Sequence, residues 1–445
     1  MSAQAANRPK IIVLDDDPTG SQTVHSCLLL MQWDVDTLRL GLADAAPIFF
    51  VLTNTRALAP DEATRITREV CHNLRLALDA EGVTEFLVVS RSDSTLRGHY
   101  PVETDAIADE LGPFDAHFLT PAFFEGGRIT RNSTHYLLIN GVETPVHETE
   151  FAQDSVFGYS TAFLPDYVAE KTGGRIAAAQ VERFELEAVR SRCQDRLMGL
   201  TGNVCCAVDG ETQADFDTFA TDLLAAAAQG KRFLFRSAAS LLTSLAQLGP
   251  QPIPAAAMAT YGRTDKPGAV IVGSHVKKTT AQLMELLKAD GIAPIELDVA
   301  RMRNDISQSA TLKQEALAKV AAAFAEHLTP VIYTSREELQ FETVERRLEF
   351  GKAVSSLLME IVQGLPPELR FLISKGGITS NDVLSVGLGL RSARLLGQIL
   401  PGCSMVTTSP EHPQFPMLPV VLFPGNVGDA TGLATVYQRL HHANG

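Results

Sequence analysis

Residues 11–20 read IIVLDDDPTG, an apolar run that ends in three consecutive aspartates and a turn. A short apolar run of this kind predicts a strand buried on both faces, which is typical of a parallel sheet. The acids then lie at the carboxyl end of the strand, where open α/β sheets bind their ligands. Because adjacent carboxylates repel unless cations or donors compensate them, Asp15, Asp16 and Asp17 favour a ligand site. The alternative is an acidic turn in which Asp17 or Thr19 caps a following helix.

The same pattern continues through the first half of the chain, where apolar runs alternate with helix-like stretches. The runs lie at 48–53, 85–90, 117–120, 204–210 and 232–237, and the clearest helix-like stretches at 60–80 and 212–228. Such alternation predicts a three-layer α/β domain with a mostly parallel sheet. We expect this domain to span residues 1–247.

Residues 248–268 are rich in proline, alanine and glycine and interrupt both patterns, which predicts a linker. The alternation resumes beyond it. Apolar runs lie at 269–273, 294–299, 330–335, 370–374 and 419–425, and helix-like stretches at 279–290, 310–327 and 342–363. We expect residues 269–445 to form a second three-layer α/β domain, with a cleft between the two domains.

The composition narrows the classes of partner. Hydrophobic residues make up 45% and charged residues 20% of the 445 residues, values typical of a globular protein. The net charge of -14 disfavours nucleic acid and anionic membranes, but a few local arginines can still hold a small anion. No signal-peptide core, membrane-spanning run or metal-ligand spacing is evident, so we expect a cytoplasmic protein with buried thiols and no resident metal centre. A homo-oligomer is compatible with this composition.

A second polar segment, SRSDSTLRGHYPVE at 90–103, also follows an apolar run. It offers guanidinium groups, hydroxyls and a glycine kink within eight positions, from Arg91, Asp93, Ser94, Thr95, Arg97 and Gly98. Such groups can grip a carboxylate and several hydroxyls at once. The alternative is a helix cap made by Asp93, Ser94 or Thr95.

Two further loops each place an arginine after a predicted strand. Arg56 lies in TNTRAL at 53–58, and Arg128 follows a glycine pair in PAFFEGGRITRN at 121–132. Because the carboxyl ends of parallel strands share one edge of a sheet, we expect both arginines to approach the aspartates.

The first polar segment also fits a D-x-D-x-T pattern in which Asp15 would be the nucleophile and Asp17 the general acid of a haloacid-dehalogenase-like phosphatase. This interpretation competes directly with the others. It needs a lysine and a further acid, for which Lys375 and Asp429 lie only in the second predicted domain.

Three glycine-containing turns follow predicted strands of the second domain, at 273–282, 375–383 and 424–432. Glycine allows backbone N–H groups to approach phosphate oxygens closely, so the turns predict a nucleotide site. Neither G-x-x-x-x-G-K-[ST] nor a strand-linked G-x-G-x-x-G is present, which excludes the two commonest phosphate-binding motifs.

Taken in order, these segments resemble the four-carbon acid sugar kinase family. The matching residues are the D-D-x-T-G turn at 16–20, the D-S-T-L-R-G block at 93–98, Pro121-Ala122-Phe123 with Gly127-Arg128, and in the second domain Gly273-Ser274, Gly376-Gly377-Ile378-Thr379 and the turn 425–428. The resemblance covers nearly the whole chain, and the D-S-T-L-R-G block is its most specific part.

The resemblance implies an enzyme that phosphorylates a hydroxyl of a small sugar acid, such as threonate, erythronate or oxo-tetronate, with ATP and Mg²⁺. The first domain would hold the acid and the second the nucleotide. Asp17 would orient or deprotonate the acceptor, and Arg56 and Arg97 would bind the substrate carboxylate. The implied acid-binding residues are Asp16, Arg56, Arg91, Asp93, Ser94, Thr95, Arg97 and Arg128, and the implied ATP-binding residues Ser274, Gly376, Gly377, Ile378, Thr379, Gly425 and Asn426. A sugar-acid-binding protein without transfer activity stays open as an alternative.

Overall fold

The computed structural model describes residues 8–139, 141–303, 305–336, 339, 341, 343–425 and 427–441. The chain divides into two compact units, Met1–Pro250 and Gln251–Gly445. Each contains a mostly parallel sheet with helices, so the prediction of two α/β domains is confirmed. The exact boundaries expected from the sequence, and the cleft between the domains, stay predictions.

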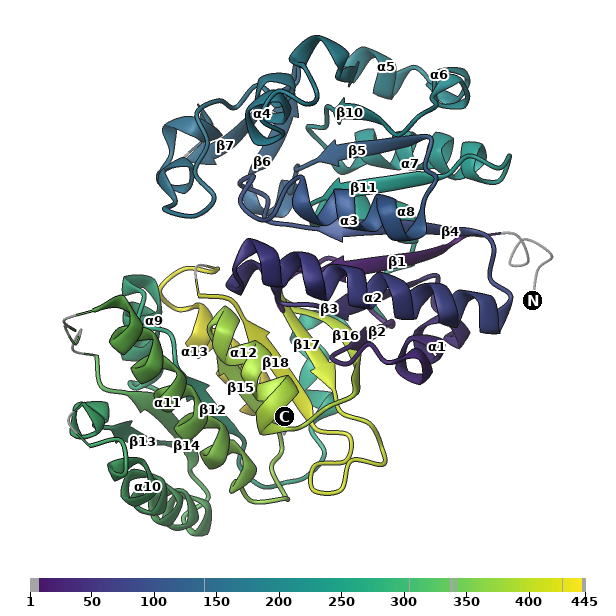
Figure 1. The fold of residues 1–445 in the computed structure, drawn as a ribbon. Helices are drawn as coiled ribbons and strands as arrows, with labels where there is room; N and C mark the ends of the chain where they lie inside the picture. The colour runs from purple at the N-terminus through teal and green to yellow at the C-terminus, as the bar shows by residue number, and fades with distance from the viewer. Residues whose placement is uncertain are drawn as a thin grey trace. The chain divides into compact units, whose positions relative to one another are not determined.

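The main sheet of the N-terminal unit is parallel throughout (Figure 1). Its strands, in spatial order, are β2 (Leu28–Leu30), β3 (Ile48–Leu52), β1 (Lys10–Asp15), β4 (Phe86–Arg91), β11 (Phe233–Ser237), β5 (Ala116–Thr120), β10 (Val204–Val208) and β9 (Glu182–Phe184). At the carboxyl edge, Asp15 of β1 lies in register with Leu52 of β3 and Arg91 of β4. The segments that leave these three strands therefore start side by side.

Helices cover the sheet because their apolar residues recur every three or four positions. In α2, Ile66, Val70 and Leu74 are buried against the same apolar cluster as alternate residues of β1, β3 and β4. The helices of this unit are α1 (Val35–Ala43), α2 (Pro60–Glu81), α3 (Val102–Leu111), α4 (Leu164–Lys171), α5 (Leu186–Arg190), α6 (Gln194–Gly199), α7 (Gln213–Ala227) and α8 (Ala239–Ala246). The predicted helices at 60–80 and 212–228 thus correspond to α2 and α7.

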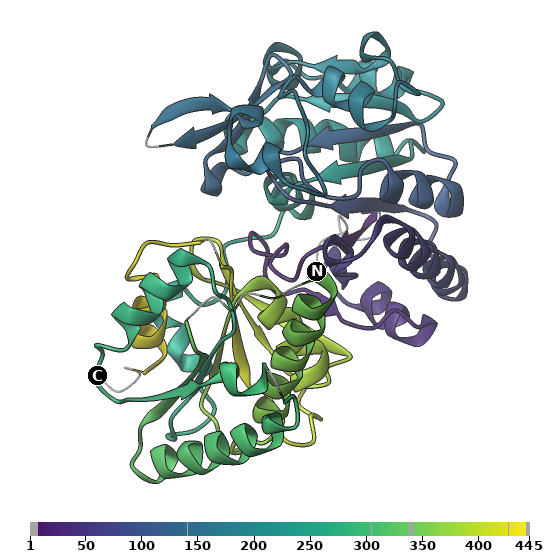
Figure 2. The same cartoon turned by 60° about the vertical axis from the view of Figure 1, so that its left-hand side comes forward.

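A small antiparallel sheet extends from the same unit (Figure 2). It consists of β6 (Arg128–Arg131), β7 (Thr134–Ile139) and β8 (Val142–Pro145). The sequence analysis did not predict it, because β6 and β8 contain no continuous apolar run and the short run at 136–139 in β7 ends in exposed residues. Its position matters for the site, since Arg128 is the first residue of β6.

The sheet of the C-terminal unit has five parallel strands followed by two antiparallel ones. In spatial order they are β13 (Ile292–Leu297), β14 (Thr329–Thr334), β12 (Ala269–Val272), β15 (Leu372–Lys375), β18 (Pro419–Phe423), β17 (Cys403–Thr407) and β16 (Ser392–Leu400). The five parallel strands match the predicted runs, whereas β16 and β17 were not predicted.

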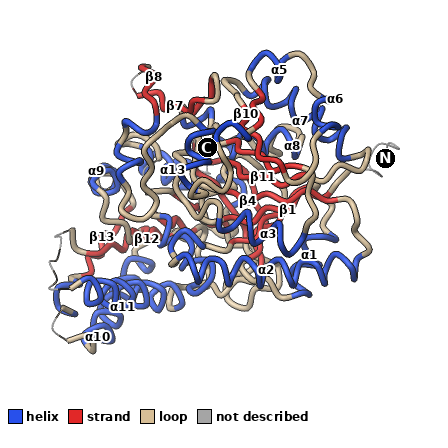
Figure 3. Tube along the Cα trace, turned by 45° about the horizontal axis from the view of Figure 1, so that its top comes forward, coloured by secondary structure: helices blue, strands red, loops and turns tan. Residues whose placement is uncertain are grey.

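Long helices flank this second sheet (Figure 3). They are α9 (Lys277–Leu286), α10 (Gln308–Ala325), α11 (Val344–Gln363), the short α12 (Gly377–Asp382), which continues into a π-helical turn at Val383–Gly387, and α13 (Gly432–His441). Residues of α9 and α13 share one core with β12, β15 and β18. Met258, within the predicted linker, is also buried in this core.

None of the helices in the described residues is both long and apolar enough to cross a membrane. All six cysteines are buried, as predicted.

Candidate active site

The three aspartates after β1 differ in their access to solvent. Asp15 has no exposed surface and Asp16 is 2% exposed, whereas the side chain of Asp17 is 23% exposed. Residues 16–23 form turns and no helix, so the helix-capping alternative was wrong. Instead, Asp17 Oδ1 accepts a hydrogen bond from the backbone N–H of Thr19 at 2.8 Å. Asp17 is therefore the carboxylate of this turn that a ligand can reach.

Two arginines compensate the charge of these aspartates. The guanidinium of Arg56 grips Asp16 with two hydrogen bonds, of 2.5 and 3.1 Å, and lies 3.5 Å from Asp17 Oδ2. Arg91 Nη1 lies 3.5 Å from Asp15 Oδ1 and 3.6 Å from Asp16 Oδ1. The strand ends thus bring Arg56 to the aspartates, as the sequence predicted, and Arg91 lies beside the aspartates as well.

This arrangement sets the protonation states. Burial alone would raise the pKa of Asp17, but the two arginines and the hydrogen bonds from Thr19 outweigh it and lower that pKa below its usual value. Burial raises the pKa of Asp15 to about 8, because Arg91 compensates it only in part. Asp17 is consequently an ionised acceptor, whereas buried Asp15 cannot touch a substrate, which argues against the phosphatase alternative with Asp15 as nucleophile.

The segment 93–98 is a loop, and no helix begins within it, so the capping alternative was wrong here too. Asp93 Oδ2 accepts hydrogen bonds from Thr95 Oγ1 and, at 2.8 Å, from Arg97 Nε. Burial would raise the pKa of Asp93, but Arg56 and Arg97 lower it far below its usual value. Asp93 therefore stays ionised and holds Arg97 in place.

Hydrogen bonds from buried side chains hold the backbone of this loop in place. Leu96 adopts a φ of 65°, which is uncommon for a residue with a side chain. Three successive carbonyl oxygens each accept a hydrogen bond from a buried side chain: Ser94 from His135 Nε2 (2.8 Å), Thr95 from Tyr159 (2.7 Å) and Leu96 from Tyr167 (2.8 Å). The loop is thus a rigid platform.

Arg128 differs from the other arginines of the site. Its Nη1 donates to the carbonyl of Gly126, its Nε is buried without a hydrogen-bond partner, and no carboxylate among the described residues forms an ion pair with it. Burial lowers its pKa, partly offset by nearby Asp93. Of Arg56, Arg91, Arg97 and Arg128, it is therefore the one that forms no ion pair with a carboxylate of the described residues.

The sequence analysis missed a buried ion pair beneath the loop. Arg236 of β11 binds Glu103 and donates to Ser90 Oγ at 2.7 Å, while Glu103 accepts from Thr55 Oγ1 at 2.5 Å. A Cβ added to Gly98 would lie 2.6 Å from the Arg236 guanidinium, so only glycine fits there. An arginine inside an otherwise apolar strand was the signal that could have revealed this pair.

The C-terminal unit contains a cavity of about 940 Å³ at the carboxyl ends of β12 and β15. Five of the predicted ATP-binding residues line it: Ser274, Gly376, Gly377, Ile378 and Thr379. Gly425 lies beside it, since a Cβ added there would be 3.5 Å from Ser274 Oγ. Asn426 lies outside the described residues.

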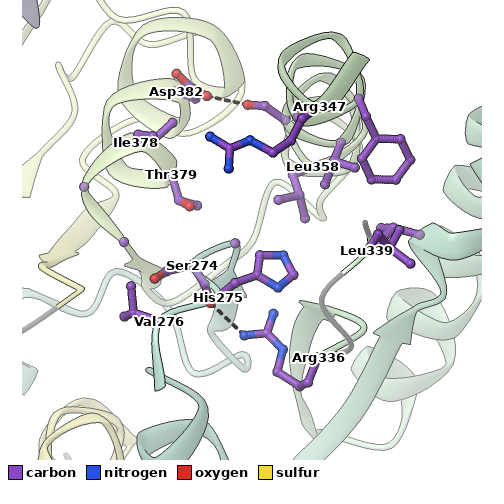
Figure 4. Close-up of a pocket in the computed structure, with 18 of the residues that line it drawn as sticks. Ser274, His275, Val276, Arg336, Leu339, Arg347, Leu358, Ile378, Thr379 and Asp382 are labelled. Carbon is purple, nitrogen blue, oxygen red and sulfur yellow. Dashed lines mark hydrogen bonds between the residues drawn. The ribbon is translucent and has the colours of Figure 1, made fainter. Parts of the chain in front are cut away.

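The opposite side of the cavity comes largely from α11, which the sequence analysis did not include (Figure 4). Arg347 reaches from that helix toward Ile378 and Thr379. The apolar part of the lining includes Val299, Leu339, Phe341, Phe350, Val354, Leu358 and Met359. The cavity thus combines glycine turns and cations with an apolar side, as a nucleotide requires.

Arg336 braces the first glycine turn. Its Nη1 donates to the carbonyl of Ser274 at 2.6 Å, and its other nitrogens donate to the backbone and hydroxyl oxygens of Thr334. Asp382, which binds Ser355, is the only carboxylate in the lining among the described residues. Since Mg²⁺ bound with a nucleotide takes few protein carboxylates, Asp382 fits such an ion.

Comparisons with known proteins match a different domain model to each half of the chain. Residues 11–245 match the model of a sugar-binding N-terminal domain, and residues 269–433 match that of a nucleotide-binding C-terminal domain. The chain is 28% identical to a D-erythronate kinase of Heliobacterium modesticaldum over 47% of either chain. It is 30% identical to a D-threonate kinase of Bordetella bronchiseptica over 35% of this chain and 38% of that enzyme. Each alignment thus spans half or less of the relative's length.

Solved structures show the same fold. A Salmonella typhimurium LT2 protein, provisionally named a tRNA synthase, superposes with a TM-score of 0.68 at 17% identity, covering 97% of this chain and 99% of that one. A Haemophilus influenzae protein superposes with a TM-score of 0.63 at 17% identity, covering 96% of this chain and all of that one. With both domain models matched in order, the chain belongs to the four-carbon acid sugar kinase family.

Proposed function

We propose that this protein is an ATP-dependent kinase that phosphorylates a hydroxyl of a small sugar acid, most simply a four-carbon one. The observation that carries the proposal furthest is the cavity of about 940 Å³, whose glycine turns, arginines and apolar side suit ATP. The named relatives are kinases of erythronate and threonate, which supports the acceptor class.

On the acceptor side, Arg128 would bind the substrate carboxylate. The sequence analysis assigned this role to Arg56 and Arg97, but both are already paired with aspartates, so we now assign them to holding Asp16, Asp17 and Asp93 in place. Ser94, on the same loop as Arg97, would contact a substrate hydroxyl. The sequence analysis gave Thr95 the same role, but its side chain is 1% exposed and its hydroxyl already donates to Asp93, so we now assign it to holding Asp93 in place.

Asp17 would accept the hydrogen bond of the acceptor hydroxyl and remove its proton during transfer. Phosphoryl transfer relies on alignment and charge neutralisation, so an ionised, partly exposed carboxylate suits this role. Mg²⁺ would neutralise phosphate charge, and Asp382 would be its protein ligand.

On the nucleotide side, the backbone N–H groups of the turns at Gly273 and Gly376 would bind phosphate oxygens. Arg347, aimed at Thr379, would meet the phosphates from the other side (Figure 4). The base would lie against the apolar residues near Phe350.

The test is ADP formation from ATP and Mg²⁺ with a panel of four- to six-carbon aldonic and keto acids. We expect at least one acid to be phosphorylated. Asp17→Asn should lower kcat by about 10²–10⁴-fold while ADP affinity stays unchanged. Asp79→Asn, at an exposed aspartate of α2, is the matched control. Acid binding without ADP formation by the wild type would favour the binding-protein alternative.

A further inference from the structure

Lys375, the last residue of β15, has no exposed surface. Its Nζ donates a hydrogen bond to the carbonyl of Pro424 and lies 4.3 Å from the centre of the Phe423 ring. Among the described residues no carboxylate forms an ion pair with it. A lysine is rarely buried in this way, because an unpaired charge loses its hydration. Its position therefore calls for a physical explanation.

Lys375 lies between two of the turns of the proposed nucleotide site. It directly precedes Gly376, which lines the cavity, and its partner Pro424 directly precedes Gly425. A second hydrogen bond, from Gly376 N–H to the carbonyl of Phe423 at 2.8 Å, joins the same two turns. The Lys375 side chain thus ties the turn after β15 to the turn after β18.

The hydrogen bond also fixes the direction of one peptide group. The Pro424–Gly425 peptide is trans, and in a trans peptide the C=O and N–H bonds point in opposite directions. Because the carbonyl of Pro424 points at Lys375, the N–H of Gly425 points away from it. Gly425 borders Ser274, which lines the cavity.

We propose that Lys375 is a positioning residue of the nucleotide site, which aims the Gly425 N–H at a bound phosphate and takes up a proton from solvent when the nucleotide binds. This inference rests on the nucleotide binding proposed above. The side chain itself is buried and does not line the cavity, so it acts through the turn and through its charge.

The proton uptake follows from the surroundings of the amine. Burial lowers the pKa of Lys375 to about 7, and Lys278 of α9 adds to this shift; Cys403 of β17 is the other titratable group beside the amine. Burial raises the pKa of Cys403, so that thiol is uncharged. Negative phosphates above the turns favour the protonated amine. Nucleotide affinity should therefore fall as pH rises above 7, by at most about tenfold per pH unit.

The test is calorimetric titration of the full-length protein with ADP at pH 8, where the nucleotide's own phosphates are ionised, in two buffers of different ionisation enthalpy. We expect the wild type to take up a measurable fraction of a proton per ADP bound and Lys375→Met to take up none. Affinity measured from pH 6.5 to 9 should decline for the wild type and stay flat for Lys375→Met.

Lys288→Met is the matched control, because Lys288 is an exposed lysine paired with Glu285 and its loss changes the net charge equally. It should keep the proton uptake of the wild type. Should Lys375→Met fail to fold, Lys375→Arg decides, since a guanidinium stays protonated and binding should take up no proton.

Wild-type binding without proton uptake, or an unchanged uptake in Lys375→Met or Lys375→Arg, overturns the role of Lys375 and leaves the proposed kinase intact. Failure of the wild type to bind ADP or ATP at any pH overturns the proposed nucleotide site, and this inference with it.

Discussion

Arg128 differs from the other arginines near the aspartates because it has no ion-pair partner among the described residues. Arg56, Arg91, Arg97 and Arg128 lie near the proposed acceptor site, and the first three are paired with aspartates. Charge-assisted hydrogen bonds contribute about 1.5–3 kcal/mol each, and an arginine already satisfied by aspartate has less to offer a substrate. Loss of Arg128 should therefore weaken binding of the sugar acid and leave binding of ATP unchanged.

Arg128→Gln should raise the KM for the sugar acid by about 10–100-fold and leave the KM for ATP unchanged. Steady-state kinetics with the acid found in the panel provides the measurement. Arg131→Gln is the control, because Arg131 lies on the same strand but pairs with Glu143 at 2.9 Å. Equal effects of the two substitutions would remove Arg128 from carboxylate binding.

Asp15 gives the protein a pH-dependent stability. An unfolded aspartate loses its proton near pH 4, whereas Asp15 in the folded state keeps its proton up to about pH 8. The folded state then binds more protons across this window, so this residue's contribution to stability falls as pH rises from about 4 to about 8 and is constant above. The slope is at most about 1.4 kcal/mol per pH unit.

Asp15→Asn mimics the protonated side chain and should abolish this slope. Urea unfolding between pH 5 and 9 should show the variant gaining stability relative to the wild type as pH rises. Asp79→Asn, at an exposed position, should run parallel to the wild type. A variant that also runs parallel would mean that folded Asp15 is ionised throughout.

The sequence analysis could predict which segments converge, but it could not predict which side chains form ion pairs. It predicted that Arg56 and Arg128 approach the aspartates, because the carboxyl ends of parallel strands converge whatever their side chains do. It could not predict that Asp93 already holds Arg97, because pairing depends on distances between loops. Arg347 was missed for another reason: in the run VERRLEF, charges look like the solvated face of a helix.

Helix α11 places one stripe of residues along the cavity. Arg347, Gly351, Val354, Ser355 and Leu358 all line it, and their spacing of three or four residues puts them on one face. Arg346 is one position away and does not line the cavity. The helix therefore contains its own matched control.

Arg347→Ala should weaken ATP binding by about tenfold or more, because a phosphate loses a charge-assisted partner, while the KM for the sugar acid stays unchanged. Arg346→Ala should bind ATP as the wild type does. Calorimetric titration of both variants with ATP compares them directly. The opposite order of effects would mean that a different face of α11 meets the nucleotide.

At the scale of elements, the apolar-run rule located the longer parallel strands but missed the three-residue parallel strands β2 and β9 and all the antiparallel ones. Buried parallel strands such as β1 and β12 are apolar on both faces, so their sequence is unambiguous. The hairpin strands β7 and β8 are partly exposed, so their sequence does not identify them as strands. The platform under Ser94 depends on His135 of β7, so its support could not be predicted either.

The proposed function divides two binding tasks between the units of the molecule, and this division can be measured. Hydrogen exchange with mass spectrometry should show that the sugar acid protects amides in 15–20 and 91–98, and that ADP protects amides in 273–280 and 376–382. At a hundredfold excess over Kd, ligand binding can add at most about 2.7 kcal/mol to the free energy of opening. Protection of 376–382 by the acid alone would contradict the assignment.

The three tethered carbonyls behind the 93–98 loop have a consequence for selectivity. A receptor that cannot rearrange presents its donors at fixed points, so two epimers of one acid cannot both satisfy them. The mismatched epimer leaves a desolvated hydroxyl without a partner, which costs affinity directly. Discrimination between epimers would thus depend on the fixed backbone of the loop as much as on the side chains that contact the acid.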